Sequence, residues 1–452
     1  MIRHFAPRSL VIFMGTLLLI LLSPVDIPSL FAAGNAPSAA ANVTADTKSL
    51  DEVFAAAVQH SEIAQIQGEL ETQTLERYKQ ARGSIFPSLN LNASYFRQED
   101  VNSVISRNVS PSSQTNVRLT AQQPLFRGFR EFAFLRQSRK LSEAQEQLKQ
   151  QALLQLYQEV AQNYLTILSV EQDLKNIRSE LDLYEDNIKE LNRRVKIGRS
   201  RLNDSLTLQS AEAQLLANQD LVRGQLKSAR QALTYLTSFD ENTLLKPLDL
   251  TISSKQSVEK YLSTLENRPD IKAGVLQTEA ADEAVTGARG AHLPSADLTA
   301  NYYLKHSGVS AASDWDATLG LTLPIFAGGT IQSQVRTAIS QRRVAELQTA
   351  SNRRLAERDV RVFHEQLMAD EAQVESLDRT QSLFERNYLQ TRKDYGLGLT
   401  TNIDVLNSLQ SYRLSRRTLD RARVNVQLDL IQLEIVSGKR SAQIAQASSS
   451  SS

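Results

Sequence analysis

The chain has 452 residues, with 51 Lys and Arg against 50 Asp and Glu, and a formal net charge of +1 at pH 7. This balance argues against nucleic acid as the main partner, because binding to a polyanion draws mainly on an excess of basic residues. The chain contains no cysteine, which excludes disulfides, thiolate chemistry, cysteine-based metal sites and a lipid attached to an N-terminal cysteine.

Residues 1–34 have the features of an export signal. Arg3 and Arg8 form a basic start, and a 13-residue run follows at 10–22 that is apolar apart from one glycine and one threonine. A signal peptide has an apolar core of about 7–15 residues, whereas a membrane-spanning helix needs about 20. We therefore expect a cleaved signal peptide and an exported protein, with a retained anchor helix as the alternative.

The rest of the chain contains a similar sequence twice. The segment ARGSIFPSLNLNASY at 81–95 returns as ARGAHLPSADLTANY at 288–302, and QQPLF at 122–126 returns 200 residues later as TLPIF. The same spacing of 200 relates Gly198 to Gly398. Repetition of this length indicates a tandem duplication.

Each copy predicts a helix, two strands and two long helices, in that order. The first copy is expected at 50–238 and the second at 257–438, with a connector at 239–256, a flexible leader at 35–49 and a disordered Ser-rich tail at 439–452. The elements expected in the first copy are a helix over 50–84, strands over 88–96 and 116–124, and helices over 129–196 and 204–237. Those expected in the second copy are a helix over 257–287, strands over 295–304 and 315–324, and helices over 330–395 and 402–436.

The four expected strands alternate apolar and polar residues. In the first strand, Leu89 and Leu91 alternate with Asn90 and Asn92. Each strand has about 9 or 10 residues, which is the length that a tilted strand needs to cross a bilayer. The same alternation occurs in the half-buried sheet of a soluble sandwich, so the strand pattern alone leaves both structures open.

The long helices decide between these two structures. Residues 129–196 would form a helix about 100 Å long at ~1.5 Å per residue, which a soluble sandwich would not need. Strands in lipid must close into a barrel, because each unpaired backbone group costs several kcal/mol there. Membrane barrels begin at about 8 strands, so closure needs two or three copies of the chain, and a twelve-stranded trimer suits an open channel better. The expected fold is therefore mainly α with membrane β, built from a duplicated helix–strand–strand–helix protomer.

Three features carry a resemblance to a known family. They are Asn-Arg-Pro-Asp-Ile at 267–271, the QQPLF and TLPIF junctions, and the spacing from glycine to aspartate after each long helix. In these features the chain resembles the TolC family of bacterial outer-membrane efflux and export channels. The resemblance implies a homotrimer with a 12-stranded barrel in the outer membrane and a 12-helix tunnel in the periplasm. Without a cysteine, the chain is similar to the unlipidated branch.

The resemblance also implies a function and partners. We expect the exit duct of a tripartite efflux system, with outer-membrane lipid around the barrel, a periplasmic adaptor protein, and an inner-membrane transporter of RND or ABC type that drives transport. The alternatives are the outer-membrane component of a type I protein secretion system or, from another class, a periplasmic coiled-coil scaffold or adaptor. We expect no enzymatic activity, cofactor, metal or nucleic acid, because the five histidines lack metal-binding spacing and neither a GxSxG nor a phosphate-loop motif occurs.

The family's periplasmic gate falls on the turns that follow the long helices. Its carboxylate ring would fall on Asp404, with Asp204 as the counterpart in the first copy, and Tyr395 matches the gating tyrosine. A second aspartate of the family is Asn407 here and its gate arginine is Thr400, so the gate would use other bonds. The competing interpretations are helix capping for the two aspartates and packing for Tyr395.

Further expected site residues lie at the turns and the strand ends. The resemblance implies adaptor docking at the two turns, which otherwise need only their glycines for chain reversal: Ile197, Gly198, Arg199, Leu397, Gly398 and Leu399. Four arginines near the first turn are candidates for the missing gate bonds: Arg193, Arg194, Arg199 and Arg201. The strand–helix junctions are expected at four prolines: Pro87, Pro124, Pro294 and Pro324.

Overall fold

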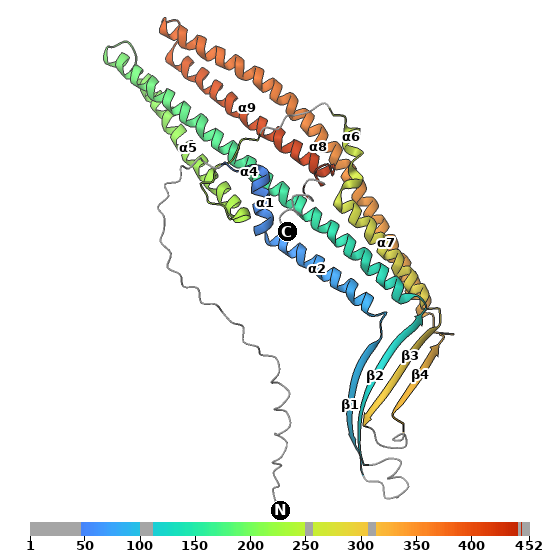
Figure 1. Ribbon diagram of the computed structural model, residues 1–452. Coiled ribbons are helices and arrows are strands. Elements are labelled where there is room, and N and C mark those ends of the chain that lie inside the picture. Colours follow the sequence, from blue (N-terminus) through green and yellow to red (C-terminus); the bar gives the residue numbers. More distant parts are fainter. Residues whose placement is uncertain (1–46, 100–111, 249–255, 306–312, 442–443, 445–452) are drawn as a thin grey trace, which may run out of the picture. The chain divides into compact units, whose positions relative to one another are not determined.

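The computed structural model describes residues 47–99, 112–248, 256–305, 313–441 and 444 (Figure 1). The expected signal peptide, most of the expected leader and most of the expected Ser-rich tail lie outside these residues. None of the helices in the described ranges combines the length and the apolar character that crossing a membrane would require.

The helices and strands follow one another in the same order in both copies. In the first copy they are α1 (Leu50–His60), α2 (Glu62–Gly83), β1 (Ser88–Arg97), β2 (Ser113–Arg127), α4 (Arg130–Lys196) and α5 (Leu202–Thr237). In the second copy they are α6 (Val258–Leu262), the short 3-10 helix η1 (Leu265–Asn267), α7 (Pro269–Gly290), β3 (Ser295–Lys305), β4 (Trp315–Thr322), α8 (Thr330–Gly396) and α9 (Asn402–Val436). The helices α4 and α8 each have 67 residues.

The first helix of each copy is interrupted, where the sequence predicts a continuous one. In the first copy the break is at Ser61, which is extended and whose N–H still donates to Ala57 O at 2.8 Å. In the second copy Arg268 is extended and Pro269 takes the first position of α7. A proline disfavours helical geometry at the residue before it but fits the first turn of a helix, so η1 and α7 are separate helices.

The prolines mark three of the four strand–helix junctions. Pro87 and Pro294 directly precede β1 and β3, and Pro324 follows β4 by two residues. The junction expected at Pro124 is wrong, because β2 continues to Arg127. A shift in the β2–β3 register occurs at Pro124, and such an irregularity accommodates a proline within a strand.

The four strands form one antiparallel sheet in the order β1-β2-β3-β4. The helices that continue these strands pack in the same order, α2 on α4, α4 on α7 and α7 on α8 (Figure 1). In the halves of the long helices away from the sheet, α5 packs on α4, α4 on α9, and α9 on α8 (Figure 1). The helix α4 therefore packs on helices of both copies, whereas α8 packs mainly on helices of the second copy.

A buried cluster anchors the connector and the end of the expected leader. Phe54 of α1 meets Tyr157 of α4 edge to face, with ring centroids 5.0 Å apart. The single O–H of Tyr164 is shared between the carbonyls of Lys48 and Lys246, and Lys48 also forms a parallel bridge with Leu245. Because Tyr164 is fully buried, these bonds hold both segments against α4.

Part of the expected disordered tail is ordered. Ile444 is 3% exposed and belongs to the same buried cluster, and its N–H donates to Arg440 O at 3.2 Å. Burial of this isoleucine stabilises a helical turn after α9. The expectation of disorder from 439 onwards is therefore wrong for 439–441 and Ile444.

Candidate functional site

The turns after α4 and α8 have the same backbone geometry. Gly198 and Gly398 have φ angles of +67° and +78°, a region that favours glycine. In the first turn the N–H of Gly198 donates to Val195 O at 3.0 Å, and that of Arg199 to Arg194 O at 2.8 Å. The second turn repeats both bonds two hundred residues later. This pair of bonds satisfies the last carbonyls of a helix that ends on a left-handed glycine.

Large apolar side chains are exposed at both turns. Ile197 in the first turn and Leu397 and Leu399 in the second are each about two-thirds or more exposed, and Arg199 is exposed beside them. An exposed cluster of large apolar side chains is typical of a surface that meets a partner. The prediction that these turns dock an adaptor remains untested by this geometry.

Both candidate gate aspartates act as helix caps. Asp404 Oδ2 accepts from the N–H of Thr401 at 2.9 Å and from its hydroxyl, and Asp204 Oδ2 accepts from the N–H of Arg201 at 3.3 Å. The Thr401 hydroxyl first, and then its N–H, hold the pKa of Asp404 below its usual range. The Asp404 side chain is nevertheless exposed, so capping leaves its charge accessible to solvent and ions.

Tyr395 is joined to one of the four candidate arginines. The Arg194 guanidinium lies over the Tyr395 ring, 4.8 Å from its centroid, and its Nε donates to Glu190 Oε1 at 3.0 Å. The hydrogen bond to Glu190 raises the pKa of Arg194. This contact links the end of α4 to the end of α8. Thr400 bonds locally to Thr401 O at 3.3 Å.

The second expected carboxylate position is occupied by an exposed amide. Asn407 lies on α9 after Asp404, and its backbone carbonyl accepts from the Ser411 hydroxyl at 2.9 Å. An amide at this position gives no fixed charge. This chain therefore lacks the carboxylate that a second ring would need at this position.

Sequence reasoning missed an ionic cluster between α4 and α9. Asp173 of α4 is 6% exposed, and its carboxylate accepts from Arg417 and from Arg421, the latter at 2.7 Å. Burial alone would raise the pKa of Asp173, but the bonds from the two arginines lower it. Nearby, Asn176 donates to Asp420 at 2.7 Å. A buried acid in the apolar stripe of a long helix was the signal that could have pointed to this cluster.

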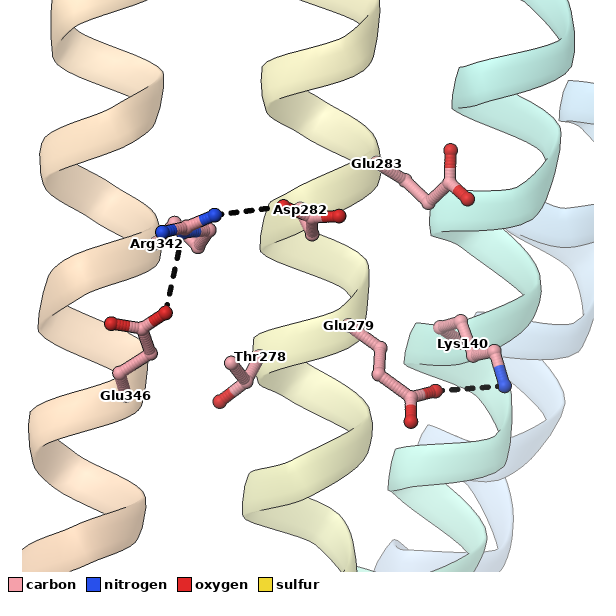
Figure 2. A pocket seen from close by; sticks show the side chains of 7 residues that line it. All are labelled: Lys140, Thr278, Glu279, Asp282, Glu283, Arg342 and Glu346. Carbon is pink, nitrogen blue, oxygen red and sulfur yellow. Dashed lines mark hydrogen bonds and ion pairs between the residues drawn. The ribbon is translucent and has the colours of Figure 1, made fainter.

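A charged cleft of about 480 Å³ lies among α4, α7 and α8 (Figure 2). Its carboxylates are paired: Lys140 lies 2.9 Å from Glu279, and Arg342 bonds to Asp282 at 3.1 Å and to Glu346 at 3.3 Å. Within the described ranges, no cluster of three or more His, Asp or Glu side chains could hold a metal ion. The cleft therefore joins helices through ion pairs.

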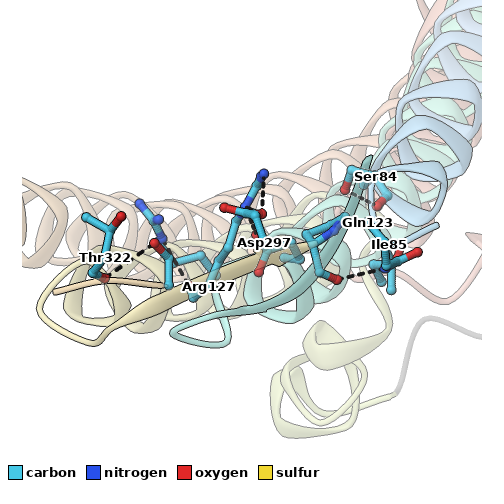
Figure 3. Close-up of polar contacts among 11 residues, drawn as sticks. Ser84, Ile85, Gln123, Arg127, Asp297 and Thr322 are labelled. Carbon is cyan, nitrogen blue, oxygen red and sulfur yellow. Dashed lines mark hydrogen bonds and ion pairs between the residues drawn. The ribbon is translucent and has the colours of Figure 1, made fainter. Parts of the chain in front are cut away.

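Polar contacts also hold the strand–helix junction between the copies (Figure 3). Gln123 Nε2 donates to Ile85 O at 2.9 Å, and Arg127 pairs with Asp297 at 2.8 Å. These bonds join β2 to the turn before β1 in the first copy, and to β3 of the second copy.

A duplicated chain, an open four-stranded sheet and long paired helices that continue its strands define a protomer of the channel-tunnel class. The chain belongs to the outer membrane efflux protein family, whose model matches residues 55–238 and 261–439. This match confirms the resemblance drawn from the repeated motifs, and it identifies the chain as an outer-membrane protein of an efflux family.

Relatives and solved structures agree with this assignment. The chain is 23% identical to the outer membrane protein TolC of Escherichia coli (strain K12) over 386 residues, which cover 80% of this chain and 76% of that protein. Its fold is similar to that of CusC, with a TM-score of 0.77 at 19% identity, over 86% of this chain and 91% of that one. It is also similar to VceC of Vibrio cholerae, with a TM-score of 0.75 at 18% identity, over 86% and 96% of the two chains. The expected fold class is thereby confirmed.

Proposed function

We propose that three copies of this protein form the exit duct of a tripartite efflux system. In this proposal their twelve strands close into one barrel in the outer membrane, and their helices continue it as a tunnel in the periplasm. The duct itself is passive and performs no enzymatic reaction. An inner-membrane transporter of RND or ABC type would drive transport, and a periplasmic adaptor would connect the two.

The open sheet is the observation that carries this proposal. The edge strands are β1 and β4, and every residue of β1 is exposed in the single chain. An open edge leaves backbone N–H and C=O groups without partners, which cannot persist in lipid. Exposed apolar side chains lie on both edge strands, and they suit contact with acyl chains: Leu89, Leu91, Leu319 and Leu321.

The turns after α4 and α8 support the proposed roles of gate and docking site. Arg194 and Tyr395 would restrain the helix ends, while the exposed Ile197, Leu397 and Leu399 would meet the adaptor. Three copies of Asp404 around an axis would form a ring that attracts cations. Capping and charge are compatible roles, because Asp404 accepts its hydrogen bonds while remaining exposed.

Complementation of a strain without its own outer-membrane efflux duct tests the proposal. The protein is expected in the outer-membrane fraction and should lower the accumulation of a fluorescent efflux substrate when a transporter and adaptor are co-expressed. Export of a protein substrate, with no change in dye accumulation, would instead favour type I secretion. A protein found in the soluble periplasmic fraction, with no effect on accumulation, would contradict the proposal.

A further inference from the structure

Two glycines make a very close backbone contact where the first copy meets the second. Gly128 lies just before α4, and Gly290 is the last residue of α7. A Cβ added to Gly128 would lie 2.1 Å from Gly290 O, and one added to Gly290 would lie 2.3 Å from Gly128 O. Neither position has room for a side chain, so the contact requires glycine at both.

The duplication places the same glycines elsewhere in the chain. Gly83 ends α2 as Gly290 ends α7, and both helices have 22 residues. Gly328 lies just before α8 as Gly128 lies just before α4, with φ angles of +58° and +65°. The residues that follow them, Gly329 and Phe129, also have positive φ. The second pair of glycines therefore has the backbone geometry of the first.

In a single chain, however, the second pair has no contact. A Cβ on either Gly83 or Gly328 would meet no atom within 4 Å. Gly83 precedes the edge strand β1, and Gly328 follows the other edge strand, β4. If β4 of one copy pairs with β1 of the next in the antiparallel sense, the end of β4 lies opposite the start of β1. The end of β2 has this same relation to the start of β3 within the chain.

An ion pair follows the same pattern. Arg136 of α4 bonds to Glu283 of α7 at 2.8 Å. The equivalent residues are Arg336 on α8 and Glu76 on α2, so the duplication preserves both charges. Among the residues that the structure describes, these two bond to nearby residues of their own helices, Arg336 to Ser333 and Glu76 to Lys79.

Equivalent apolar residues of the two copies differ in how far they are buried. The difference is the one expected if α8 and α2 each lack a neighbouring helix in the single chain. Ala144 of α4 is buried, whereas its equivalent Val344 of α8 is 51% exposed. Ala273 of α7 is buried, whereas its equivalent Ile66 of α2 is 56% exposed. The larger apolar side chain is thus on the exposed helix in both cases, and both would be covered if α8 packed on α2 of another copy.

We infer that Gly328 of one copy packs against Gly83 of the neighbouring copy, beside an ion pair between Arg336 and Glu76. This inference rests on the proposed ring of copies and assigns the contacts at its subunit boundary. The bond between Arg127 and Asp297 has no equivalent there, because Ala327 and Asn90 occupy these positions. The boundary between subunits therefore lacks one ion pair that the boundary within the chain has.

Alanine substitution separates this contact from the fold of the single chain. Gly83→Ala adds a methyl group that meets nothing within its own chain and favours the helix, but it would clash with the neighbouring Gly328. We expect retained helicity by circular dichroism and loss of the trimer by light scattering in detergent. The matched control is Gly68→Ala in the same helix, which also meets no atom within 4 Å. Its equivalent is Val275, so a side chain is tolerated there and the trimer should persist.

Cross-linking tests the same boundary without a clash. The chain has no cysteine, so Glu76→Cys combined with Arg336→Cys can be joined by a short bismaleimide with no background. We expect covalent dimers and trimers on denaturing gels. The control pair, Arg136→Cys with Glu283→Cys, should link within one chain, so the protein should stay at the monomer position on the gel.

The outcomes distinguish this inference from the proposed function. A conducting trimer that gives no cross-link at 76 and 336, or that tolerates Gly83→Ala, would overturn the glycine contact while leaving the duct in place. A protein that forms neither a trimer nor a pore would overturn both. A cross-linked ring whose trimer is lost in Gly83→Ala alone supports the contact.

Discussion

At the turn before α9, the Asp404 carboxylate caps the helix and also remains exposed to solvent. The position of Asp404 just after a glycine turn, at the start of a helix, was enough to indicate capping as one of two interpretations, because capping depends on neighbouring residues alone. The proposed carboxylate ring depends on other copies of the chain, so no local pattern could establish it.

Asp404→Asn separates capping from charge. The amide oxygen still accepts the Thr401 N–H, so the helix end should persist, while the proposed ring loses its charge. We expect a lower preference for cations in single-channel recordings. Because its hydrogen bonds lower the pKa of Asp404, the wild-type preference should persist on acidification to about pH 4 and weaken only below the usual aspartate pKa of about 3.9. Unchanged selectivity in the variant would assign this residue to capping alone.

The contact between Arg194 and Tyr395 should restrain the ends of α4 and α8. Both residues are half-buried, and a cation–π pair that keeps contact with solvent contributes about 0.5–1 kcal/mol. Arg194→Ala is therefore expected to increase the open probability several-fold in single-channel recordings. Tyr395→Phe keeps the ring and should behave as the wild type, and Arg193→Ala is the control for loss of a positive charge nearby. Equal behaviour of Arg194→Ala and Arg193→Ala would exclude the proposed restraint.

At the scale of elements, the ionic cluster of Asp173 fixes α4 against α9. The acid comes from the first copy and both arginines from the second, so this cluster joins the two copies. The Asp173 carboxylate is buried, Arg417 is half-buried and Arg421 is exposed. Breaking an ion pair whose acid is buried is costly, because it leaves a charge away from water without its partner.

Asp173→Ala should therefore destabilise the protein more than loss of a surface pair. We expect a decrease of about 3 kcal/mol in the free energy of unfolding, measured by denaturant titration in detergent. The control is Asp378→Ala, which removes the exposed pair with Arg423 and should cost at most about 1 kcal/mol. Similar decreases in the free energy of unfolding of the two variants would show that the burial of Asp173 does not add to its contribution to stability.

Most helices and strands could be predicted, because their signals are local. Glycines at 198 and 398 end the long helices, and alternation marks the strands. The exceptions depend on distant partners: β2 passes through Pro124 because the β2–β3 register accommodates a shift there, and Asp173 is paired only because α9 packs on α4. Periodicity shows which face of a helix is buried but not which charged residue lies opposite.

At the scale of the whole molecule, we claim that a single chain supplies only one part of the channel wall and needs neighbouring copies on both sides. The sheet ends in two open edges, and α8 buries few residues although it is as long as α4. Further copies of the chain would supply the missing neighbours on both sides. The same neighbouring copies that would close the sheet in lipid would therefore also cover the exposed apolar residues of α8 and α2.

Recording from a planar lipid bilayer tests this claim most directly. Purified protein is added to one side, and the current is followed at constant voltage. If the strands of several copies close into one barrel, the current should rise in discrete steps of uniform size that favour cations, and Gly83→Ala should reduce their frequency sharply. A bilayer that stays electrically silent at protein concentrations where the trimer is present in detergent would contradict the account.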